Sequence, residues 1–394
     1  MSRKEGLRPE SIAVHGGRRS GPPSGGPLVE PIFQTVPFSF ADPEALTRAS
    51  HGDPPDAFYT REGNPTVALA EGKLAALEGA SGAALFASGM GAISTAFLAH
   101  LKAGDHVVAT EDLYGGTLRL FKEVLEPMGI ATTLVPTEVR PKLEEAVRPE
   151  TRWIYVESPT NPLVKIVDLP FVADLARRRN LTAVIDGTFA SPVLQRPLEL
   201  GFHLVLHSAT KYLNGHADVT AGFAAGGEPM IEPIRARRVR TGAILDPHAA
   251  FLLNRGMKTL ALRVRAQSDN ALRLAELLAA HRGVERVHYP GLSAHAGHDA
   301  AARQMKAFGA MLAFDVRGGL EAARRFLSRL SLIALATSLG SVETTADLPW
   351  LTSHRHVTPE KKRELGIQEG TIRLSVGAEA FEDLSRDLQD ALSS

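Results

Sequence analysis

Apolar residues along the chain recur in two alternating patterns, one typical of amphipathic helices and one typical of buried strands. The expected helices lie at 67–77, 89–101, 118–128 and 169–179, and the expected strands at 83–87, 106–109, 132–135, 153–156, 183–185 and 204–206. Continuous apolar strands between helices are typical of a mainly parallel sheet that is covered on both faces. We therefore predict an α/β domain over residues 64–247.

The segments on either side of this domain have different patterns. Residues 1–63 are rich in glycine and proline with little helical periodicity, so we expect an extended arm that lies on its own body or on a neighbouring subunit. Residues 248–394 predict a smaller α+β domain. Its expected helices lie at 249–281 (one long helix), 320–330 and 381–392, and its strands at 284–287, 311–316 and 373–376.

Composition narrows the possible partners. Lys and Arg total 44 and so do Asp and Glu, which gives no basic field of the kind that binds nucleic acid. No apolar run is long enough for a membrane span, and Met1–Pro9 lacks an apolar signal core. The chain contains no cysteine, which excludes thiol catalysis and agrees with a reducing cytoplasm. We expect a cytoplasmic protein without nucleic-acid or membrane partners.

The tetrad Ser208-Ala209-Thr210-Lys211 is the strongest candidate for chemistry, because it follows an apolar strand and precedes the turn Asn214-Gly215. A lysine at such a corner loses hydration, and its free amine can form a Schiff base with a carbonyl compound. The tetrad also fits the S-x-x-K motif of penicillin-binding hydrolases, in which the serine is the nucleophile. The tetrad alone leaves both chemistries open.

Four further groups lie at the ends of expected elements, where ligands of parallel sheets bind. The Ser-Gly turn before the helix at 89 could bind a phosphate, although it could also be a simple helix cap. An aspartate at a strand end can balance a cationic ring nitrogen or form a turn. A buried arginine needs a carboxylate from the protein or from a substrate. The Ser-Gly turn is 87–91, the strand-end aspartate is Asp186 and the buried arginine is Arg373. The fourth group is the proline-containing loop 157–162, which carries Glu157 and Asn161.

The hydrolase alternative fits poorly. Ser268-Asp269-Asn270 spells its second motif, but Lys258-Thr259 precedes that motif, lacks the required glycine and falls on the same expected long helix. The histidines form no metal-binding motif, so we expect no metal site.

Seven segments together resemble the cystathionine-synthase and lyase family of pyridoxal-phosphate (PLP) enzymes of cysteine and methionine metabolism. In chain order they are YTREGNPT (59–66), SGM (88–90), YGGT (114–117), ESPTNP (157–162), Asp186, SATK (208–211) and RLSVG (373–377). The resemblance covers nearly the whole chain. It implies fold type I, with a mainly parallel seven-stranded sheet, a smaller C-terminal domain and an N-terminal arm, and a homotetramer of two tight dimers with shared active sites.

The resemblance also implies roles for individual residues. Lys211 would hold PLP as a Schiff base and move protons, and Asp186 would pair with the pyridine nitrogen. Tyr114 would stack on the ring and act as an acid or base. The phosphate would be bound by Ser88, Gly89, Met90, Ser208 and Thr210, and by Tyr59 and Arg61 of the neighbouring subunit. The substrate pocket would contain Asn161 and Arg373, which bind the α-carboxylate, together with Ser338, Thr337 and Gly116.

Departures from the family pattern bear on the substrate. Gly116 stands where familiar methionine γ-lyases carry cysteine, and Thr337 stands where enzymes acting on cystathionine usually carry glutamate. Residues 241–248, 255–260 and 347–349 look closest to the γ-lyase branch. We expect a carbon–sulfur lyase that acts by γ-elimination on cystathionine, methionine or homocysteine. The alternatives are γ-replacement, as in cystathionine γ-synthase or O-acetylhomoserine sulfhydrylase, and a cofactor-free binding protein.

Overall fold

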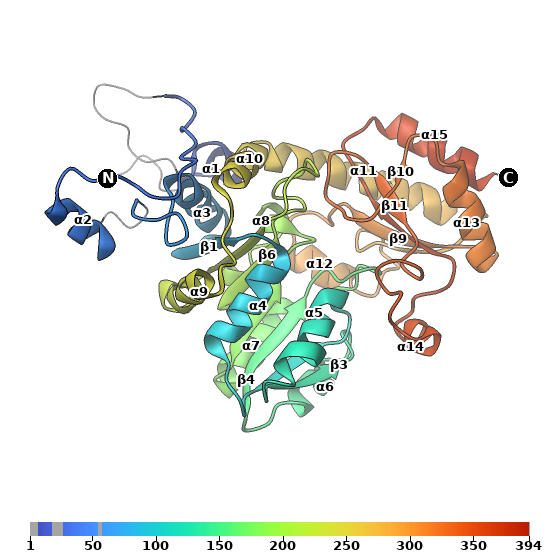
Figure 1. The fold of residues 1–394 in the computed structure, drawn as a ribbon. Helices are drawn as coiled ribbons and strands as arrows, with labels where there is room; N and C mark the ends of the chain where they lie inside the picture. The colour runs from blue at the N-terminus through green and yellow to red at the C-terminus, as the bar shows by residue number, and fades with distance from the viewer. Residues whose placement is uncertain (1–6, 18–26, 54–56, 394) are drawn as a thin grey trace. The chain divides into compact units, whose positions relative to one another are not determined.

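The chain forms two compact units, each built from two separate stretches of sequence. Residues 1–101 and 203–261 form the first unit, and residues 102–202 and 262–394 form the second. The structure is a computed structural model that describes residues 7–17, 27–53 and 57–393 (Figure 1). The arm, PLP-domain and C-terminal-domain boundaries predicted at residues 63 and 247 stay a prediction.

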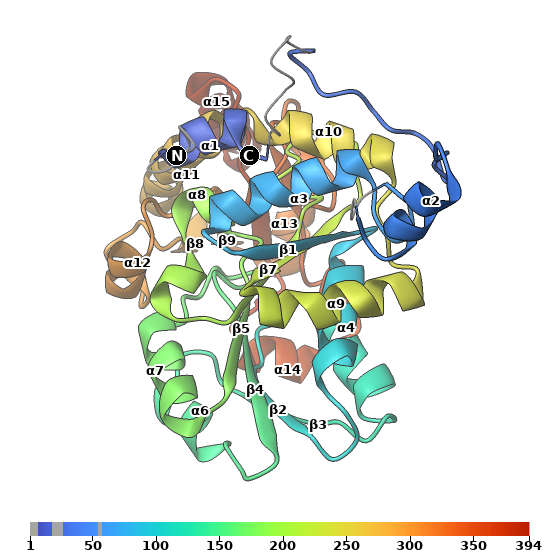
Figure 2. The ribbon, with the colours of Figure 1, turned by 90° about the vertical axis from the view of Figure 1, so that its left-hand side faces the viewer.

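The first unit contains strands β1, β6 and β7 with helices on both sides. β7 pairs antiparallel with both other strands, so that Gly222 is opposite Phe86 on one side and Ser208 on the other. Helices α3 and α9 pack on β1, as Figure 2 shows. The elements are α1 (Pro9–His15), α2 (Pro43–Ser50), α3 (Pro65–Glu78), β1 (Gly82–Phe86), α4 (Gly89–His100), β6 (Leu204–Ser208), β7 (Gly222–Gly226), α9 (Glu228–Thr241) and α10 (Pro247–Met257).

Local sequence signals set the bounds of α3. The Asn64 side chain accepts a hydrogen bond from the Thr66 amide, Pro65 occupies the first turn, and Gly79 ends the helix with a φ of 72°. These are the residue types that favour a helix start and a left-handed helix end. The expected helix at 67–77 is therefore confirmed, with two more residues at its start and one at its end.

The N-terminal arm differs from the expectation. Residues 1–63 were expected to form an extended arm with little helical periodicity, and two short helices, α1 and α2, lie within them. Part of the arm lies on its own body, since α1 packs on α3 and the Phe33 amide donates to Oγ1 of Thr66 at 2.9 Å. Residues 1–6, 18–26 and 54–56 of the expected arm lie outside the described residues.

The second unit contains four parallel strands and a separate five-stranded sheet. The parallel strands are β2 (His106–Thr110), β3 (Ala131–Val135), β4 (Thr151–Glu157) and β5 (Thr182–Asp186). The helical segments between and after them are α5 (Gly115–Leu120), a π-helical turn (Phe121–Leu125), α6 (Arg140–Glu145), α7 (Leu169–Arg179), α8 (Ser191–Leu194) and a 3₁₀ turn (Pro197–Leu200). The helix expected at 118–128 is thus a short α-helix followed by a π-helical turn.

The five-stranded sheet has the order β10-β11-β12-β9-β8 and carries the C-terminal helices. Helices α13 and α15 pack against each other, and α13 covers β9 and β12. The elements are α11 (Leu260–Ala280), β8 (Val284–His288), α12 (His298–Gln304), β9 (Met311–Val316), α13 (Gly319–Arg329), β10 (Ala334–Leu335), β11 (Thr345–Asp347), α14 (Pro359–Glu364), β12 (Thr371–Ser375) and α15 (Phe381–Leu392).

The fold class is confirmed as mixed α/β with a large and a smaller sheet. The large sheet has seven strands in the order β1-β7-β6-β5-β4-β2-β3, with β7 as its antiparallel member. The single long helix expected at 249–281 is wrong, because α10 ends at Met257 and α11 begins at Leu260. The Lys258 and Thr259 amides bond to the carbonyls three residues earlier, which tightens the turn and ends α10. Apolar periodicity cannot reveal so short a break.

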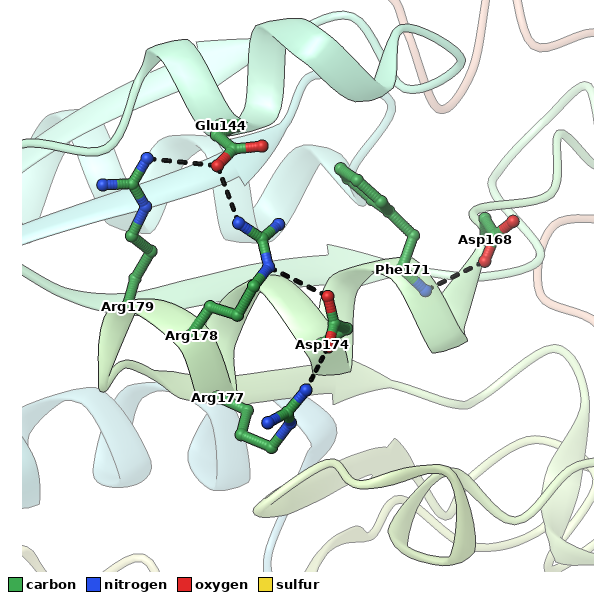
Figure 3. A network of polar contacts seen from close by, with 7 residues as sticks. All are labelled: Glu144, Asp168, Phe171, Asp174, Arg177, Arg178 and Arg179. Carbon is green, nitrogen blue, oxygen red and sulfur yellow. Dashed lines mark hydrogen bonds and ion pairs between the residues drawn. The ribbon is translucent and has the colours of Figure 1, made fainter.

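Charged residues reinforce the ends of α7, as Figure 3 shows. The Asp168 side chain accepts from the Phe171 amide at 3.0 Å at the start of the helix. In the last turn, Glu144 of α6 accepts from Arg178 at 3.0 Å and from Arg179 at 3.1 Å. The Arg178 and Arg179 guanidiniums hold the pKa of Glu144 below its usual range. Cations at a helix C-terminus also interact favourably with the helix dipole.

Two kinds of feature are absent from the described residues. No helix in these parts of the chain is both long and apolar enough to cross a membrane. Likewise, the described His, Asp and Glu side chains form no group of three or more that could hold a metal ion.

Candidate active site

Lys211 lies in a tight turn directly after β6. Its amide donates to the Ser208 carbonyl at 3.1 Å, and its own carbonyl accepts from the Gly215 amide at 2.8 Å. Gly215 has a φ of 76°, a conformation that favours glycine. The chain therefore turns back instead of opening the helix that an S-x-x-K nucleophile needs. The hydrolase motifs are also misplaced, because Lys258 ends α10 and Ser268 lies inside α11.

The Ser-Gly turn at 88–89 lies against the end of β6. Ser88 caps α4, and its Oγ accepts from the Gly91 amide at 3.0 Å. A Cβ atom on Gly89 would lie only 2.9 Å from Cβ and 3.1 Å from Oγ of Ser208. Only glycine allows so close an approach, which brings two hydroxyls and the N-terminus of α4 into one cradle.

Thr210 is fixed beside this cradle. Its Oγ1 accepts from the Ala221 amide at 2.9 Å and donates to the Ala221 carbonyl at 3.2 Å. Met90 follows in the first turn of α4 and is half-buried. Backbone amides at a helix N-terminus and nearby hydroxyls are the groups that bind phosphate. The residues of this cradle therefore fit the phosphate of PLP.

Tyr59 and Arg61 lie elsewhere in the first unit and remain accessible. The Arg61 guanidinium carbon is 5.6 Å from the centre of the Tyr59 ring, and Nη1 donates to the Val239 carbonyl at 3.3 Å. Tyr59 is 38% exposed, and Arg61 borders a cavity of about 320 Å³ between the start of α3 and α9. The structure brings these two residues together, and Arg61 contacts α9 through the Val239 carbonyl.

In the second unit, Tyr114, Glu157 and Asp186 lie at the ends of parallel strands. Glu157 ends β4 and is the register partner of Asp186 at the end of β5. Oε2 of Glu157 accepts from the Tyr114 amide at 2.8 Å, and Oδ1 of Asp186 accepts from the Thr188 amide at 2.9 Å. Tyr114 caps α5, which carries Gly116, and its side chain is 47% exposed. The Tyr114 ring is therefore accessible.

Burial changes the ionisation of the carboxyl group behind Tyr114. Glu157 is 4% exposed, and its burial followed by repulsion from Asp186 raises its pKa well above the usual range. The Tyr114 amide opposes this shift but does not reverse it. Sequence analysis assigned Glu157 to a proline-containing loop and did not predict its hydrogen bond with the Tyr114 amide.

Arg373 is held in a buried set of acceptors in the same unit. Nη1 donates to Oδ1 of Asn161 at 3.0 Å, and Nη2 donates to the Ser338 carbonyl at 3.0 Å. Nη2 also donates to Oδ2 of Asp347 at 2.5 Å, and Asp347 faces Arg373 across the antiparallel pair β11–β12. The predicted need of Arg373 for a carboxylate is met by Asp347. Sequence analysis did not assign Asp347 to the site.

The segment carrying Thr337 and Ser338 lies at the edge of this set. Both residues are exposed, and Ser338 has a φ of 78°, which is rare for a residue other than glycine. The Gly340 amide donates to Oγ of Ser375 at 2.8 Å, which ties the segment to the strand that bears Arg373.

The predicted residues thus form two groups within the two units. Lys211 belongs with the cradle of Ser88, Gly89, Ser208 and Thr210, whereas Tyr114 and Asp186 belong to the unit of Arg373.

Comparison with known proteins identifies the chemistry. The model of the family described as "Cys/Met metabolism PLP-dependent enzyme" matches residues 10–393. The chain belongs to this family.

Relatives within the family share almost the full length. L-methionine gamma-lyase of Pseudomonas putida is 44% identical over 370 residues, which cover 93% of each chain. Cystathionine beta-lyase of Lactococcus lactis is 40% identical and covers 96% of this chain and 97% of the relative. A crystal structure of cystathionine gamma-lyase from Lactobacillus plantarum, complexed with L-serine, matches with a TM-score of 0.92 at 39% identity, covering 98% of this chain and 99% of that one. The chain is therefore a PLP-dependent enzyme of the lyase class with fold type I.

Proposed function

We propose that this family member cleaves the carbon–sulfur bond of a sulfur amino acid by γ-elimination. The observation that carries the proposal is the buried Arg373, which Asn161 and Asp347 orient as a binding site for an amino-acid carboxylate. The names of the relatives favour elimination over replacement. Water is consumed, the sulfur leaves as a thiol, and the substrate nitrogen leaves as ammonia, which gives a 2-oxo acid.

The protein groups have distinct tasks in this proposal. Bound PLP supplies an electron sink for the substrate's α-carbon. Lys211 Nζ holds the cofactor and takes the proton from the α-carbon. Tyr114 Oη takes a proton from the substrate amine or gives one to the leaving sulfur. Asp186 would keep the ring nitrogen protonated, and Arg373 would bind the substrate carboxylate.

The remaining predicted residues bind the phosphate or border the substrate in this proposal. Ser88, Gly89, Met90, Ser208 and Thr210 bind the phosphate, and the cradle in which Gly89 touches Ser208 supports this role. Ser338, Thr337 and Gly116 border the substrate. The residue limits 64–247 and 248–394 define the cofactor and C-terminal domains.

Elimination and replacement share these residues, so products must separate them. Cystathionine, methionine and an O-acylhomoserine are each incubated with the PLP-loaded protein, with and without added cysteine. We expect a 2-oxo acid and ammonia from a sulfur amino acid alone. Consumption of only the O-acylhomoserine, and only with a nucleophile present, would establish γ-replacement as in cystathionine γ-synthase or a sulfhydrylase.

Lys211→Ala tests the cofactor attachment. The loss of one positioned acid–base group lowers a rate by about 10²–10⁴-fold, and we expect at least this loss of lyase activity. Borohydride should fix PLP to the wild-type protein but not to the variant. Lys122→Ala, on the exposed π-helical turn, is the control and should keep both properties. Borohydride labelling that persists in Lys211→Ala would contradict the assigned attachment.

We further propose a cytoplasmic homotetramer of two tight dimers, in which Tyr59 and Arg61 bind the phosphate of the neighbouring subunit. The exposure of both side chains supports this arrangement, as does the exposure of the arm residues Leu28, Val29 and Phe33. Sedimentation would measure the assembly. Mixing the two inactive variants Arg61→Ala and Lys211→Ala should restore activity, because a mixed dimer contains one intact site. No recovery in co-refolded mixtures would place Arg61 in its own subunit's site.

A further inference from the structure

Glu157 is a buried carboxyl group to which the reaction described above gives no task. It lies at the C-terminal end of β4, beside Asp186 at the end of β5. Register partners on adjacent parallel strands direct their side chains to the same face of the sheet. The two residues are 4% and 6% exposed, so water screens their charges poorly.

Two carboxylates in such a place cannot both ionise without a large cost. The contacts distinguish the two groups. Asp186 accepts the Thr188 amide at Oδ1, which favours its ionised form, and its task at the ring nitrogen requires a negative charge. Burial and Asp186 raise the pKa of Glu157, and Asp112 adds further repulsion.

The other charged and titratable groups around Glu157 do not remove this conflict. Asp112 is paired with Lys165, whose Nζ lies 3.1 Å from both of its oxygens. Tyr155 on β4 is fully buried, and burial raises its pKa as well. Within the described residues, the hydrogen bond to Glu157 comes from the Tyr114 amide, a neutral donor.

We propose that Glu157 is a positioning residue that stays protonated at neutral pH, holds Tyr114 through its backbone amide, and leaves Asp186 as the charged carboxylate. The inference rests on the proposed roles of Tyr114 and Asp186. A carbonyl oxygen of a neutral carboxyl group accepts the Tyr114 amide, so α5 begins at a fixed point. An ionised Glu157 would compete with Asp186 for the positive charge of the ring.

The distinguishing comparison is between Glu157→Gln and Glu157→Ala. Glutamine keeps a neutral acceptor of the same length, whereas alanine leaves the Tyr114 amide without it. Amide hydrogen exchange at Tyr114 should stay slow in Glu157→Gln and become at least tenfold faster in Glu157→Ala. The PLP dissociation constant, measured by equilibrium dialysis, should change less than threefold in the first variant and rise more than tenfold in the second.

Infrared spectra of the full-length protein without cofactor report the proton itself. At pH 7, the difference spectrum of wild type minus Glu157→Gln should show the carbonyl band of a protonated carboxyl group. Labelling with ¹³C-glutamate should shift that band. Glu150→Gln, an exposed site in the loop before β4, should leave the band, the exchange rate and the PLP affinity unchanged.

Two results would overturn the inference. One is the absence of the protonated-carboxyl band from the difference spectrum. The other is fast exchange at Tyr114 in Glu157→Gln, because glutamine would then fail to replace the acid. Both measurements use Glu157→Gln, so they test the inference even if Glu157→Ala does not fold. None of these readouts depends on carbon–sulfur cleavage, so a protein that cleaves no sulfur amino acid would refute the proposed reaction and leave this test intact.

Discussion

Oδ2 of Asp347 lies 2.5 Å from Nη2 of Arg373, and both side chains are almost fully buried. The aspartate therefore pairs with the buried arginine and offsets its charge. Burial raises the pKa of Asp347, and the Arg373 charge only partly offsets this effect. In the proposed function, this pair would set how strongly Arg373 attracts the carboxylate of a substrate.

Asp347→Ala should destabilise the ligand-free protein by about 3–5 kcal/mol, because it leaves a buried cation without its carboxylate partner. An amino-acid ligand should restore part of this loss, since its carboxylate replaces the missing charge. Urea unfolding with and without saturating ligand measures both effects. Glu369→Ala breaks the exposed pair with Arg363 and should cost at most about 1 kcal/mol. An equal cost in the two variants would refute a special role for the buried pair.

Gly89→Ala should weaken PLP binding by more than about tenfold, because the new Cβ would lie 2.9 Å from Cβ of Ser208 and would widen the cradle. Overpacking of this kind typically costs about 1–3 kcal/mol. Gly91→Ala is the matched control on the same helix, where the nearest atom would be an acceptable 3.4 Å away. Fluorescence titration with PLP and with inorganic phosphate would measure both variants. Unchanged phosphate affinity in Gly89→Ala would place the phosphate elsewhere.

His354 should make the protein less stable in acid. Burial, with help from the Arg373 and Lys362 charges, lowers the pKa of His354 to about 4. In the unfolded chain the pKa of this histidine is about 6.5, so above that pH the side chain is neutral in both states and costs no stability. As the pH falls towards 4, the unfolded chain takes up a proton that the folded protein does not, and roughly 3 kcal/mol of stability is lost. Thermal unfolding between pH 7 and 4 should show a shallower loss in His354→Gln. The wild-type loss of melting temperature between pH 7 and 4 should persist in His356→Gln, because the His356 side chain is exposed. Identical slopes in wild type and His354→Gln would show that other groups cause the acid sensitivity.

Thr337→Glu should shift substrate preference towards cystathionine. A glutamate at this exposed position could pair with the distal amino group of that substrate, and an exposed ion pair contributes about 0.2–1 kcal/mol. The ratio of kcat/KM for cystathionine to that for methionine should therefore rise about 1.4- to fivefold. Thr337→Gln, which lacks the charge, controls for side-chain length. A fall in the ratio would place the distal amino group away from residue 337.

Sequence patterns predicted β4 and β5 because both strands are continuously apolar and end in polar residues. They missed β7 (GFAAG, 222–226), in which every residue except Phe223 is a glycine or alanine with weak strand propensity. The structure explains this composition, since a Cβ on Gly222 would lie 1.9 Å from the Ser88 carbonyl oxygen. The requirement is set by a segment more than a hundred residues away.

The same limit applies to the site. Lys211, Asp186 and Arg373 were identified from motifs that are local in sequence. The Asp347–Arg373 and Glu157–Tyr114 contacts depend on strand register and loop packing, which composition and periodicity do not encode. Burial also raises the pKa of Glu157 at the end of β4, and burial follows only from the assembled sheet.

The end of α10 has a consequence for protein engineering. A Cβ on Gly256 would lie 2.3 Å from the carbonyl oxygen of Asn214, in the turn that follows Lys211. Any larger residue must push this turn, although Gly256 is in none of the groups that bind cofactor or substrate. Residue 256 is therefore a position from which the reactive amine could be displaced, and catalysis retuned, without altering any side chain that meets the reactants.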